Sequence, residues 1–309
     1  MTPLLSICIP TYNHAELLDQ ALARLTSLPA FASGDIEIVI SDNASPDGTR
    51  SVGERYASAF PGRVNYFRNP ENVLDANFGL ALSRGTGDFL KLANDTILFS
   101  AEGLAEMLAA VRRHRDARPV LFFSNLGGEP SEVACDSFDA LFGEISYHST
   151  WIGSFGIWKT DFDALEDFAR ARDLQLTQVD VLCRLMAAKG RAVVNRAVFG
   201  ESLPRRVIGG YNLAKVFGRN YCSILREYVA KGLFSRRAFR REKFRMLRYH
   251  ILPFYLSLSP KHAFPKSGYL RYLLSDYWSI PFYWCTVPFA FAAALCKPVL
   301  GFFRSGGAA

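Results

Sequence analysis

An alternation of buried-strand and helical patterns runs through residues 4–125, and it constrains the fold more than any other feature of the chain. Apolar runs with the length of buried strands occupy 4–10, 36–42, 64–69, 88–94 and 119–125. Apolar residues at helical spacing predict helices over 15–27, 49–59, 77–83 and 101–115. Strands that alternate with helices predict βαβ units and a mainly parallel sheet with helices on its faces. The sequence therefore indicates an α/β, Rossmann-like fold.

Polar side chains gather where three of the expected strands end. They are Pro10, Thr11 and Tyr12 after the first strand, Asp42 after the second, and Asn94 and Asp95 after the fourth. Ligands of open α/β sheets bind beyond the carboxyl ends of the strands, so we expect these side chains to meet at one edge. Taken singly, each has a simpler explanation, because Asp before a Gly-containing turn is typical of the turn and Tyr after a strand is typical of packing. Together they predict a crevice for a flat, polar ligand.

The composition is that of a folded protein with an anionic partner. Half of the 309 residues are hydrophobic and 21% are charged, which excludes a disordered chain. The formal net charge of +7 favours a nucleotide, a nucleic acid or an acidic membrane surface as partner. The six cysteines form no CxxC pair, so we expect no zinc site and no disulfide framework, and reduced thiols favour the cytoplasm. We also expect no signal peptide, because no basic, cleavable leader precedes the first strand.

Three stretches carry a family resemblance. They are LSICIPTYN (5–13), IVISDNASPDGT (38–49) and RNPENVLDANFGLALSRGTGDFLKLAND (68–95). In this order and spacing they resemble glycosyltransferase family 2, which has the GT-A fold. Within that family the chain looks most similar to abequosyltransferase-like enzymes that build bacterial surface polysaccharides. The resemblance implies a GT-A-type domain over residues 1–205, with a mixed, mainly parallel sheet flanked by helices.

The resemblance implies a site for a nucleoside-diphosphate sugar. Its residues would be Pro10, Thr11, Tyr12, Asp42, Asn72, Asn77 and Asn94. The first three would border the base. The Asp42 carboxylate would accept a hydrogen bond from a base imide N–H, which favours uracil or thymine and hence UDP or dTDP. Asn72 and Asn77 fall in the segment that lines the base, ribose and diphosphate in the family.

Asp95 occupies the position of the family's metal-binding acidic cluster. Mg²⁺ or Mn²⁺ there would neutralise the diphosphate leaving group as a Lewis acid, and oxygen ligands suit both ions. The family usually has two or three acidic residues at this point, whereas the stretch LANDTIL of this chain has Asp95 alone. Metal dependence therefore stays open, with a helix N-cap or a turn as the alternative role of Asp95.

The resemblance also implies a general base at the start of a later helix. Inverting transfer needs an acidic side chain that takes the proton of the acceptor hydroxyl. Asp180 lies in the opening turn of the helix expected over LQLTQVDVLCRLMAAKG, without the second acid that the family has beside it. Because the helix dipole alone favours Asp in a first turn, both roles stay open. Trp151, in the preceding segment HSTWIGSFGIW, either stacks on a sugar face or packs in the core.

Residues 206–309 are expected to form a helical, membrane-associating region. Residues 231–250 are densely basic with interleaved aromatic residues, which favours an anionic membrane surface over a solvated helix face. Residues 277–296 carry no charge over a length that can span a bilayer, but two prolines interrupt them. We therefore expect contact with the membrane surface through 231–250 and 277–303, by monotopic insertion rather than a span. A soluble cap helix is the alternative, and the basic segment favours the cytoplasmic face of the inner membrane.

The function that the resemblance implies is inverting transfer of a sugar from a UDP or dTDP sugar to a hydroxyl of a lipid-linked glycan, in bacterial surface polysaccharide synthesis. Two other functions stay open. One is a catalytically weak sugar-nucleotide-binding subunit of a membrane assembly, which the single acid at Asp95 favours. The other is transfer to polyprenyl phosphate itself. A nucleic-acid partner is not expected, because the sequence contains no recognised nucleic-acid-binding module.

Overall fold

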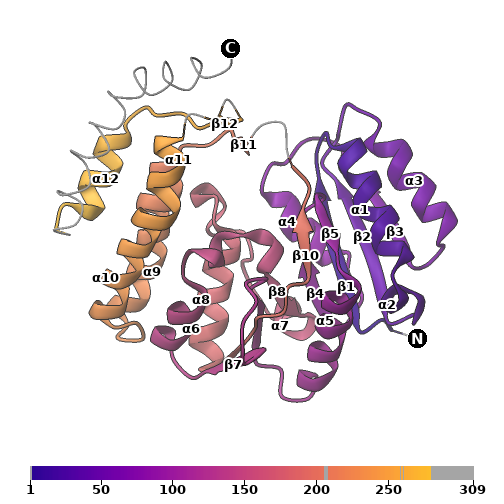
Figure 1. Ribbon diagram of the computed structural model, residues 1–309, viewed down its shortest axis with the longest axis horizontal. Helices are drawn as coiled ribbons and strands as arrows, with labels where there is room; N and C mark the ends of the chain where they lie inside the picture. Colours follow the sequence, from indigo (N-terminus) through magenta and orange to yellow (C-terminus); the bar gives the residue numbers. More distant parts are fainter. Residues whose placement is uncertain (1, 205–207, 258, 260, 280–309) are drawn as a thin grey trace, which may run out of the picture. The chain divides into compact units, whose positions relative to one another are not determined.

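The structure is a computed structural model that describes residues 2–204, 208–257, 259 and 261–279. The chain divides into two units, residues 1–204 and residues 205–309. Strands and helices alternate through most of the first unit, and the described part of the second is mainly helical (Figure 1).

Five strands form the central sheet of residues 1–204. They are β1 (Leu5–Thr11), β2 (Ile36–Asp42), β3 (Val64–Arg68), β4 (Phe89–Leu92) and β8 (Gly156–Trp158), in the order β3-β2-β1-β4-β8. Strands β1 to β4 are parallel to their neighbours, and β8 runs antiparallel to β4 at the edge. The predicted mixed, mainly parallel α/β sheet is confirmed.

Helices cover both faces of this sheet. Core contacts on one face come from α1 (Ala15–Ser27), α2 (Pro29–Ala32) and α5 (Ala101–His114), with α3 (Thr49–Ala59) beside α1 and β3. Because side chains alternate along a strand, Leu5, Ile7 and Ile9 of β1 enter this core. The residues between them point to the other face, where α4 (Ala76–Ser83) contacts β1, β2 and β4. This arrangement leaves the carboxyl ends of the strands as the edge on which a site can be built.

Short elements complete the first unit. The strands are β6 (Val120–Phe123), β9 (Ala192–Asn195) and β7 (Glu132–Cys135), which form one sheet, and β5 (Ile97–Phe99) and β10 (Gly200–Ser202), which form another. The helices are α6 (Phe138–Ile145), α7 (Lys159–Asp163) and α8 (Thr177–Lys189), with 3₁₀ turns at Ser146–Thr150, Ile152–Ser154 and Arg172–Leu174. Leu121 and Phe123 of β6 join the same core as β1, so these elements extend one hydrophobic interior.

The described part of residues 205–309 is built mainly from helices. They are α9 (Tyr221–Ala230), α10 (Arg236–Arg245), α11 (Leu252–Leu256) and α12 (Tyr269–Tyr277), with π-helical segments Ala214–Asn220 and Met246–Ile251. A short pair, β11 (Ile208–Gly209) and β12 (His262–Ala263), runs in parallel. Arg226 pairs with the Asp276 carboxylate at 2.5 Å, and the buried Lys243 donates to the Asp276 carbonyl, so polar contacts hold α12 to α9 and α10.

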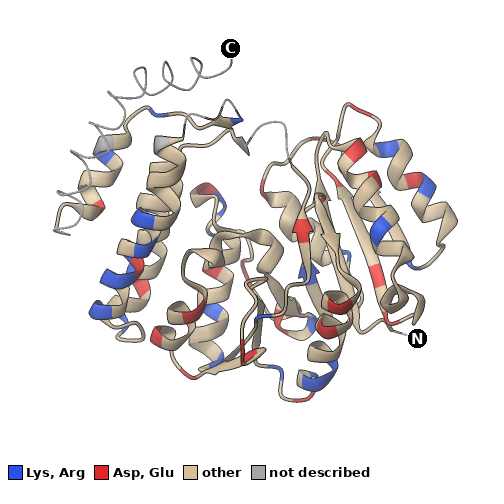
Figure 2. Ribbon diagram, in the orientation of Figure 1, with Lys and Arg blue, Asp and Glu red and all other residues tan. Residues whose placement is uncertain are grey.

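The basic segment 231–250 divides its side chains between core and surface. Phe234, Met246 and Leu247 are buried, so these interleaved apolar residues serve the core of the unit. The arginines of α10 that are exposed are Arg236, Arg237, Arg240 and Arg241. Lys and Arg, drawn in blue, recur along this helix in Figure 2. Among the residues that the structure describes, no helix is both long and apolar enough to cross a membrane. Residues 280–303 of the expected membrane segment lie outside the described residues.

Candidate functional site

The polar residues that end β1, β2 and β4 meet at one edge of the central sheet. Thr11 stands opposite Asp42 in the parallel register of β1 and β2. The Thr11 hydroxyl donates to Oδ2 of Asp95, 84 residues away in the chain, over 2.8 Å. The backbone N–H of Asn13 donates to Oγ of Ser45, which joins the loop after β1 to the loop after β2. The structure therefore brings Thr11, Asp42 and Asp95 to one place, as the strand ends predict.

Asp95 is held by two side chains from the N-terminal motif. Besides the Thr11 hydroxyl, Nδ1 of His14 lies 2.8 Å from the same carboxylate oxygen, Oδ2. The Asp95 side chain is 4% exposed and that of His14 is 33% exposed, so the imidazole separates the buried carboxylate from solvent. The sequence analysis overlooked His14, although it directly follows Asn13 in the motif.

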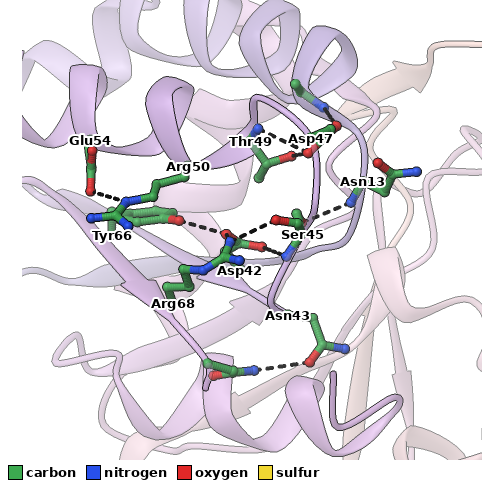
Figure 3. A network of polar contacts seen from close by, with 12 residues as sticks. Asn13, Asp42, Asn43, Ser45, Asp47, Thr49, Arg50, Glu54, Tyr66 and Arg68 are labelled. Atoms are coloured by element: carbon green, nitrogen blue, oxygen red, sulfur yellow. Dashed lines mark hydrogen bonds and ion pairs between the residues drawn. The ribbon is translucent and has the colours of Figure 1, made fainter. Parts of the chain in front are cut away.

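Asp42 lies in a buried polar network (Figure 3). Its Oδ2 accepts hydrogen bonds from Tyr66 Oη at 2.6 Å and from Arg68 Nη1 at 2.7 Å, and Oδ1 accepts from Ser45 N–H at 2.9 Å. Burial and the bond to Asp42 raise the pKa of Tyr66 well above its usual range. The Asp42 side chain has no exposed surface, and these three donors use both of its oxygens. The role of Asp42 in base recognition stays a prediction.

Four asparagines fix the segment after β3. Asn77 accepts from Ser41 Oγ and donates to the Ser41 carbonyl, so this predicted ligand residue already joins α4 to β2. Asn69 Nδ2 bonds to Asn77 at 2.9 Å and to Asn43 at 3.2 Å. Asn72 Oδ1 accepts from Asn43 Nδ2 at 2.8 Å, which ties the loop of Asn72 to the end of β2. These hydrogen bonds hold residues 69–77 against the end of β2, and this segment forms one wall of the site.

The remaining predicted donor residues differ in exposure. Pro10 is buried in β1, whereas Tyr12 is 44% exposed and offers its ring to a ligand. Oδ1 of Asn94 is buried and accepts no hydrogen bond from the described residues. It lies beside Gly153, where an added Cβ would come within 2.8 Å of it. Among the described residues, the Asn94 side chain therefore has a buried oxygen that no donor satisfies, next to Asp95.

A cavity of about 470 Å³ opens beside this wall. Residues 72–75 line one part of it, and Arg172, Asp173 and Gln175 line another. The second wall lies directly before α8, which carries the predicted base. Its lining combines carboxylates, amides and a guanidinium with the apolar residues Val73 and Leu74, and so suits a ligand with both polar groups and apolar faces.

Asp180 is buried in the first turn of α8 and is bound by arginine. Arg170 Nε lies 2.9 Å from both of its oxygens, and Arg170 Nη2 lies 2.6 Å from Oδ1. Arg184, one turn later, lies 3.6 Å from Oδ2. An acceptor hydroxyl can meet this carboxylate once Arg170 leaves one oxygen. The catalytic role of Asp180 stays a prediction, and its contacts in the structure are those of an anchor.

Two buried side chains underlie the segment before β8. Trp151 stacks on Phe199 with ring centroids 5.8 Å apart and planes at 6°, which is the core-packing alternative. Lys91 of β4 is fully buried and donates to the carbonyls of Leu92 and Gly153. Burial lowers the pKa of Lys91 to about 7. Sequence reasoning placed Lys91 in a strand and assigned it no role.

The donor set around Asp95 gives a divalent metal few protein ligands. Its Oδ2 already accepts from Thr11 and binds His14. In the described part of the chain, no group of three or more His, Cys, Asp or Glu side chains could hold a metal ion. Because Mg²⁺ takes one or two carboxylates and completes its shell with waters and substrate phosphates, these residues fit such an ion when a diphosphate is present.

Comparison with known proteins agrees with the resemblance read from the sequence. Residues 6–129 match the family model described as Glycosyl transferase family 2. The chain is 33% identical over 151 residues to abequosyltransferase RfbV of Salmonella typhimurium, covering 48% of this chain and 41% of that protein. It is 31% identical over 160 residues to a PGL/p-HBAD biosynthesis glycosyltransferase of Mycobacterium bovis, covering 50% and 53%. The chain spans about half the length of these curated relatives.

Solved structures share the fold at low sequence identity. S. aureus TarS 1–349 in complex with UDP-GlcNAc superposes with a TM-score of 0.58 and 14% identity, over 90% of this chain and 81% of that one. Mannosyltransferase PcManGT from Pyrobaculum calidifontis, in complex with GDP-Man and Mn²⁺, gives a TM-score of 0.55 and 17% identity, over 97% and 88%. These similarities support the predicted GT-A-like fold.

Proposed function

Residues 6–129 belong to glycosyltransferase family 2, and from this we propose that the chain transfers a sugar from a nucleoside diphosphate to a hydroxyl group, with inversion. The observation that carries the proposal is the meeting of Thr11, Asp42 and Asp95 at the carboxyl ends of three parallel strands. Such an edge is where open α/β sheets bind nucleotides. The names of the sequence relatives point to the same class of reaction.

The donor that we propose is a UDP or dTDP sugar. The exposed ring of Tyr12 can cover the base, and Asp42 can accept from its imide N–H after displacement of a present donor. TarS holds UDP-GlcNAc and PcManGT holds GDP-Man, so these neighbours support a nucleotide sugar, and the preference for uracil or thymine rests on Asp42. Asn94, whose amide oxygen lacks a partner among the described residues, can accept a hydrogen bond from the ribose or the sugar.

The chemistry needs charge neutralisation at the diphosphate and a proton acceptor at the incoming hydroxyl. When Mg²⁺ or Mn²⁺ is bound, it supplies Lewis-acid stabilisation of the leaving diphosphate, with Asp95 as its protein ligand. Thr11 and His14 hold the Asp95 carboxylate in position. Asp180 takes the hydroxyl proton once Arg170 has moved from one of its oxygens.

The test uses the purified full chain with UDP and dTDP sugars, with and without Mn²⁺. We expect sugar-nucleotide hydrolysis, and we expect Asp95→Ala to remove most of it. Calorimetry should show that Mn²⁺ binds measurably in the presence of UDP and weakly in its absence, because the protein offers a single carboxylate. Activity that survives in Asp95→Ala would remove Asp95 from the mechanism. If neither nucleotide is bound or hydrolysed, the proposed function fails.

We propose a lipid-linked glycan as acceptor, at the cytoplasmic face of the inner membrane. The support is the exposed basic surface of α10 and the uncharged sequence 277–296. Deletion of 277–309 should release the protein into the soluble fraction. A full-length chain that is soluble without detergent would contradict membrane insertion.

The ion pair of Asp180 favours a second candidate function. A carboxylate whose two oxygens both accept from Arg170 suits a sugar-nucleotide-binding subunit with weak catalysis. If the chain is such a subunit, the unaltered protein should bind UDP, and its turnover with any acceptor should be as low as that of the Asp180→Asn variant. Transfer to polyprenyl phosphate, the remaining alternative, is tested by adding that lipid in place of a glycan acceptor.

A further inference from the structure

We propose that the cavity between residues 72–75 and 172–175 is a subsite for a neutral, hydroxyl-rich glycan, and that Asp75 contacts this glycan. The proposal rests on the proposed glycosyl transfer, for which the glycan would be the acceptor. The cavity measures about 470 Å³, which suits a small ligand such as one or two sugar rings. Its location before α8 places it on the side of the predicted general base.

The charges of the lining favour a sugar over a diphosphate. Asp173 is 97% exposed and lies 3.9 Å from Arg172, so solvent and this guanidinium offset its charge. The half-buried Asp75 carboxylate remains, and it would repel a diphosphate in this cavity. Sugar hydroxyls both donate and accept, so they can satisfy the Asp75 carboxylate and the amide of Gln175 together.

Asp75 is the member of this lining that most needs a partner. It stands at the N-terminus of α4, but its side chain makes no capping hydrogen bond. Within the described residues, no hydrogen bond or ion pair reaches its carboxylate, although the residue is half-buried. Burial raises the pKa of Asp75. A hydroxyl that donates to this carboxylate would offset the cost of burying it unpaired.

Both walls are fixed before any ligand arrives. Asn43 holds the first wall, because its Oδ1 accepts from Val73 N–H at 2.9 Å and its Nδ2 donates to Asn72. The ion pair between Arg170 and Asp180 anchors the second wall to α8.

The helix that follows the first wall packs against the segment that precedes the second wall. Gly79 of α4 leaves room for Phe168, since an added Cβ would come within 2.9 Å of that ring. Gln175 has a left-handed φ of 59° because it ends the 3₁₀ turn Arg172–Leu174, so a capped turn fixes the backbone of the second wall.

The experiment measures glycan and nucleotide binding separately on the full chain. The fluorescently labelled protein is titrated on an array of bacterial surface oligosaccharides, and UDP is titrated by calorimetry. Asp75→Asn keeps the size of the side chain and removes its charge. We expect glycan affinity to fall about tenfold in Asp75→Asn, whereas UDP affinity stays within about twofold.

Two further variants serve as controls. Asp173→Asn alters a carboxylate that is 97% exposed, and so already hydrated, and should change glycan affinity by less than about threefold. Asp116→Asn alters an exposed carboxylate outside the cavity lining and should change neither affinity. Thermal melts should show that all three variants fold, because Asp75 makes no hydrogen bond that the substitution removes.

The outcomes separate this proposal from the proposed function. A tenfold loss of UDP affinity in Asp75→Asn would assign the cavity to the nucleotide and overturn the glycan subsite. Unchanged glycan binding in Asp75→Asn, or no glycan bound by the unaltered chain, would overturn it as well. Failure of the unaltered chain to bind UDP or dTDP would instead contradict the proposed donor, while glycan binding that depends on Asp75 would still stand.

Discussion

At the scale of single residues, Lys91 places an amine inside the sheet. Two backbone carbonyls accept its hydrogen bonds, and its Nζ lies 5.1 Å from the centre of the Phe199 ring. Burial holds the pKa of Lys91 at about 7, below the usual 10.5. Between these two values the unfolded chain binds a proton that the folded chain has lost, so the free energy of unfolding should rise with pH.

We expect Lys91→Met to stabilise the protein by about 1–4 kcal/mol near pH 6, where the folded state carries the buried charge. The gain should shrink as pH rises toward about 10, because the folded wild-type lysine is then neutral. Urea unfolding of both proteins at several pH values measures this difference. Lys159→Met, which alters a surface amine paired with Asp163, is the control and should show no such trend. A gain that is constant with pH would contradict the buried-charge explanation.

Asp180 has two possible roles, a general base and a structural anchor paired with Arg170, and mutation can separate them. Asp180→Asn and Arg170→Gln each break the ion pair and should lower the free energy of unfolding by about 1–3 kcal/mol. If Asp180 is the base, Asp180→Asn should also lose about 10²–10⁴-fold in kcat, since proton transfer contributes that much. Arg170→Gln keeps the carboxylate and should lose far less. Equal losses of kcat in the two variants would show that Asp180 acts through its anchor role alone.

Sequence reasoning found the acids of the site and Thr11, but not the charged or ring partners of these acids. Asp42, Asp95 and Asp180 stand out because each follows or opens a predicted element. Their partners Arg68 and His14 lie 26 and 81 residues away from Asp42 and Asp95. The register of β2 and β3 sets Arg68 beside Asp42, and the loops after β1 and β4 bring His14 to Asp95. A buried acid at a strand end requires a donor, so the sequence predicts that a partner exists without saying which residue it is.

At the scale of elements, α3 packs on β3 because Gly53 has no side chain. An added Cβ would lie 2.1 Å from Cδ2 of Tyr66, the residue that donates to Asp42. We expect Gly53→Ala to destabilise the protein by about 1–3 kcal/mol through overpacking, which exceeds the gain in helix propensity of about 1 kcal/mol. Chemical unfolding measures the change, and nucleotide binding should weaken with it if Asp42 reads the base.

The matched control for this prediction is Gly143 of α6. Among the residues that the structure describes, no atom lies within 4 Å of a Cβ added there. Gly143→Ala should therefore stabilise the protein by about 0.5–1 kcal/mol through helix propensity alone. Stabilisation by both substitutions would show that Tyr66 moves aside without cost, and would contradict the packing argument.

The long elements of the first unit could be predicted and the short ones could not. Helix α1 and strand β2 have the bounds that apolar spacing predicts, because buried faces impose a clear period on long elements. Strands such as β5 and β10 have three residues each, too few to show a period, and they form through pairing with distant segments. The 3₁₀ turn Arg172–Leu174 is equally short, and only the fold brings it to the same cavity as Asp75, so sequence reasoning missed Asp75 and Arg172.

At the scale of the whole molecule, the excess positive charge lies in one segment. The chain has 36 basic and 29 acidic residues, and residues 231–250 contain eight of the basic residues and a single acid, Glu242. The rest of the chain is therefore balanced. A balanced remainder gives no reason for general attraction to anions, so any electrostatic attraction to a membrane should come from this segment.

We expect the full chain to sediment with phosphatidylcholine vesicles that contain phosphatidylglycerol more strongly than with vesicles that lack it. Changing Arg236, Arg237, Arg240 and Arg241 together to Gln should weaken this binding about 10²–10³-fold, since each basic residue near an anionic surface contributes about 1 kcal/mol. The matched control changes Arg50 and Arg55, exposed on α3 and each paired with an acid, and should bind as the unaltered chain does. High salt should weaken binding of the unaltered chain, because screening shortens the reach of the charges. Unchanged binding of the fourfold variant would assign membrane contact to another part of the chain.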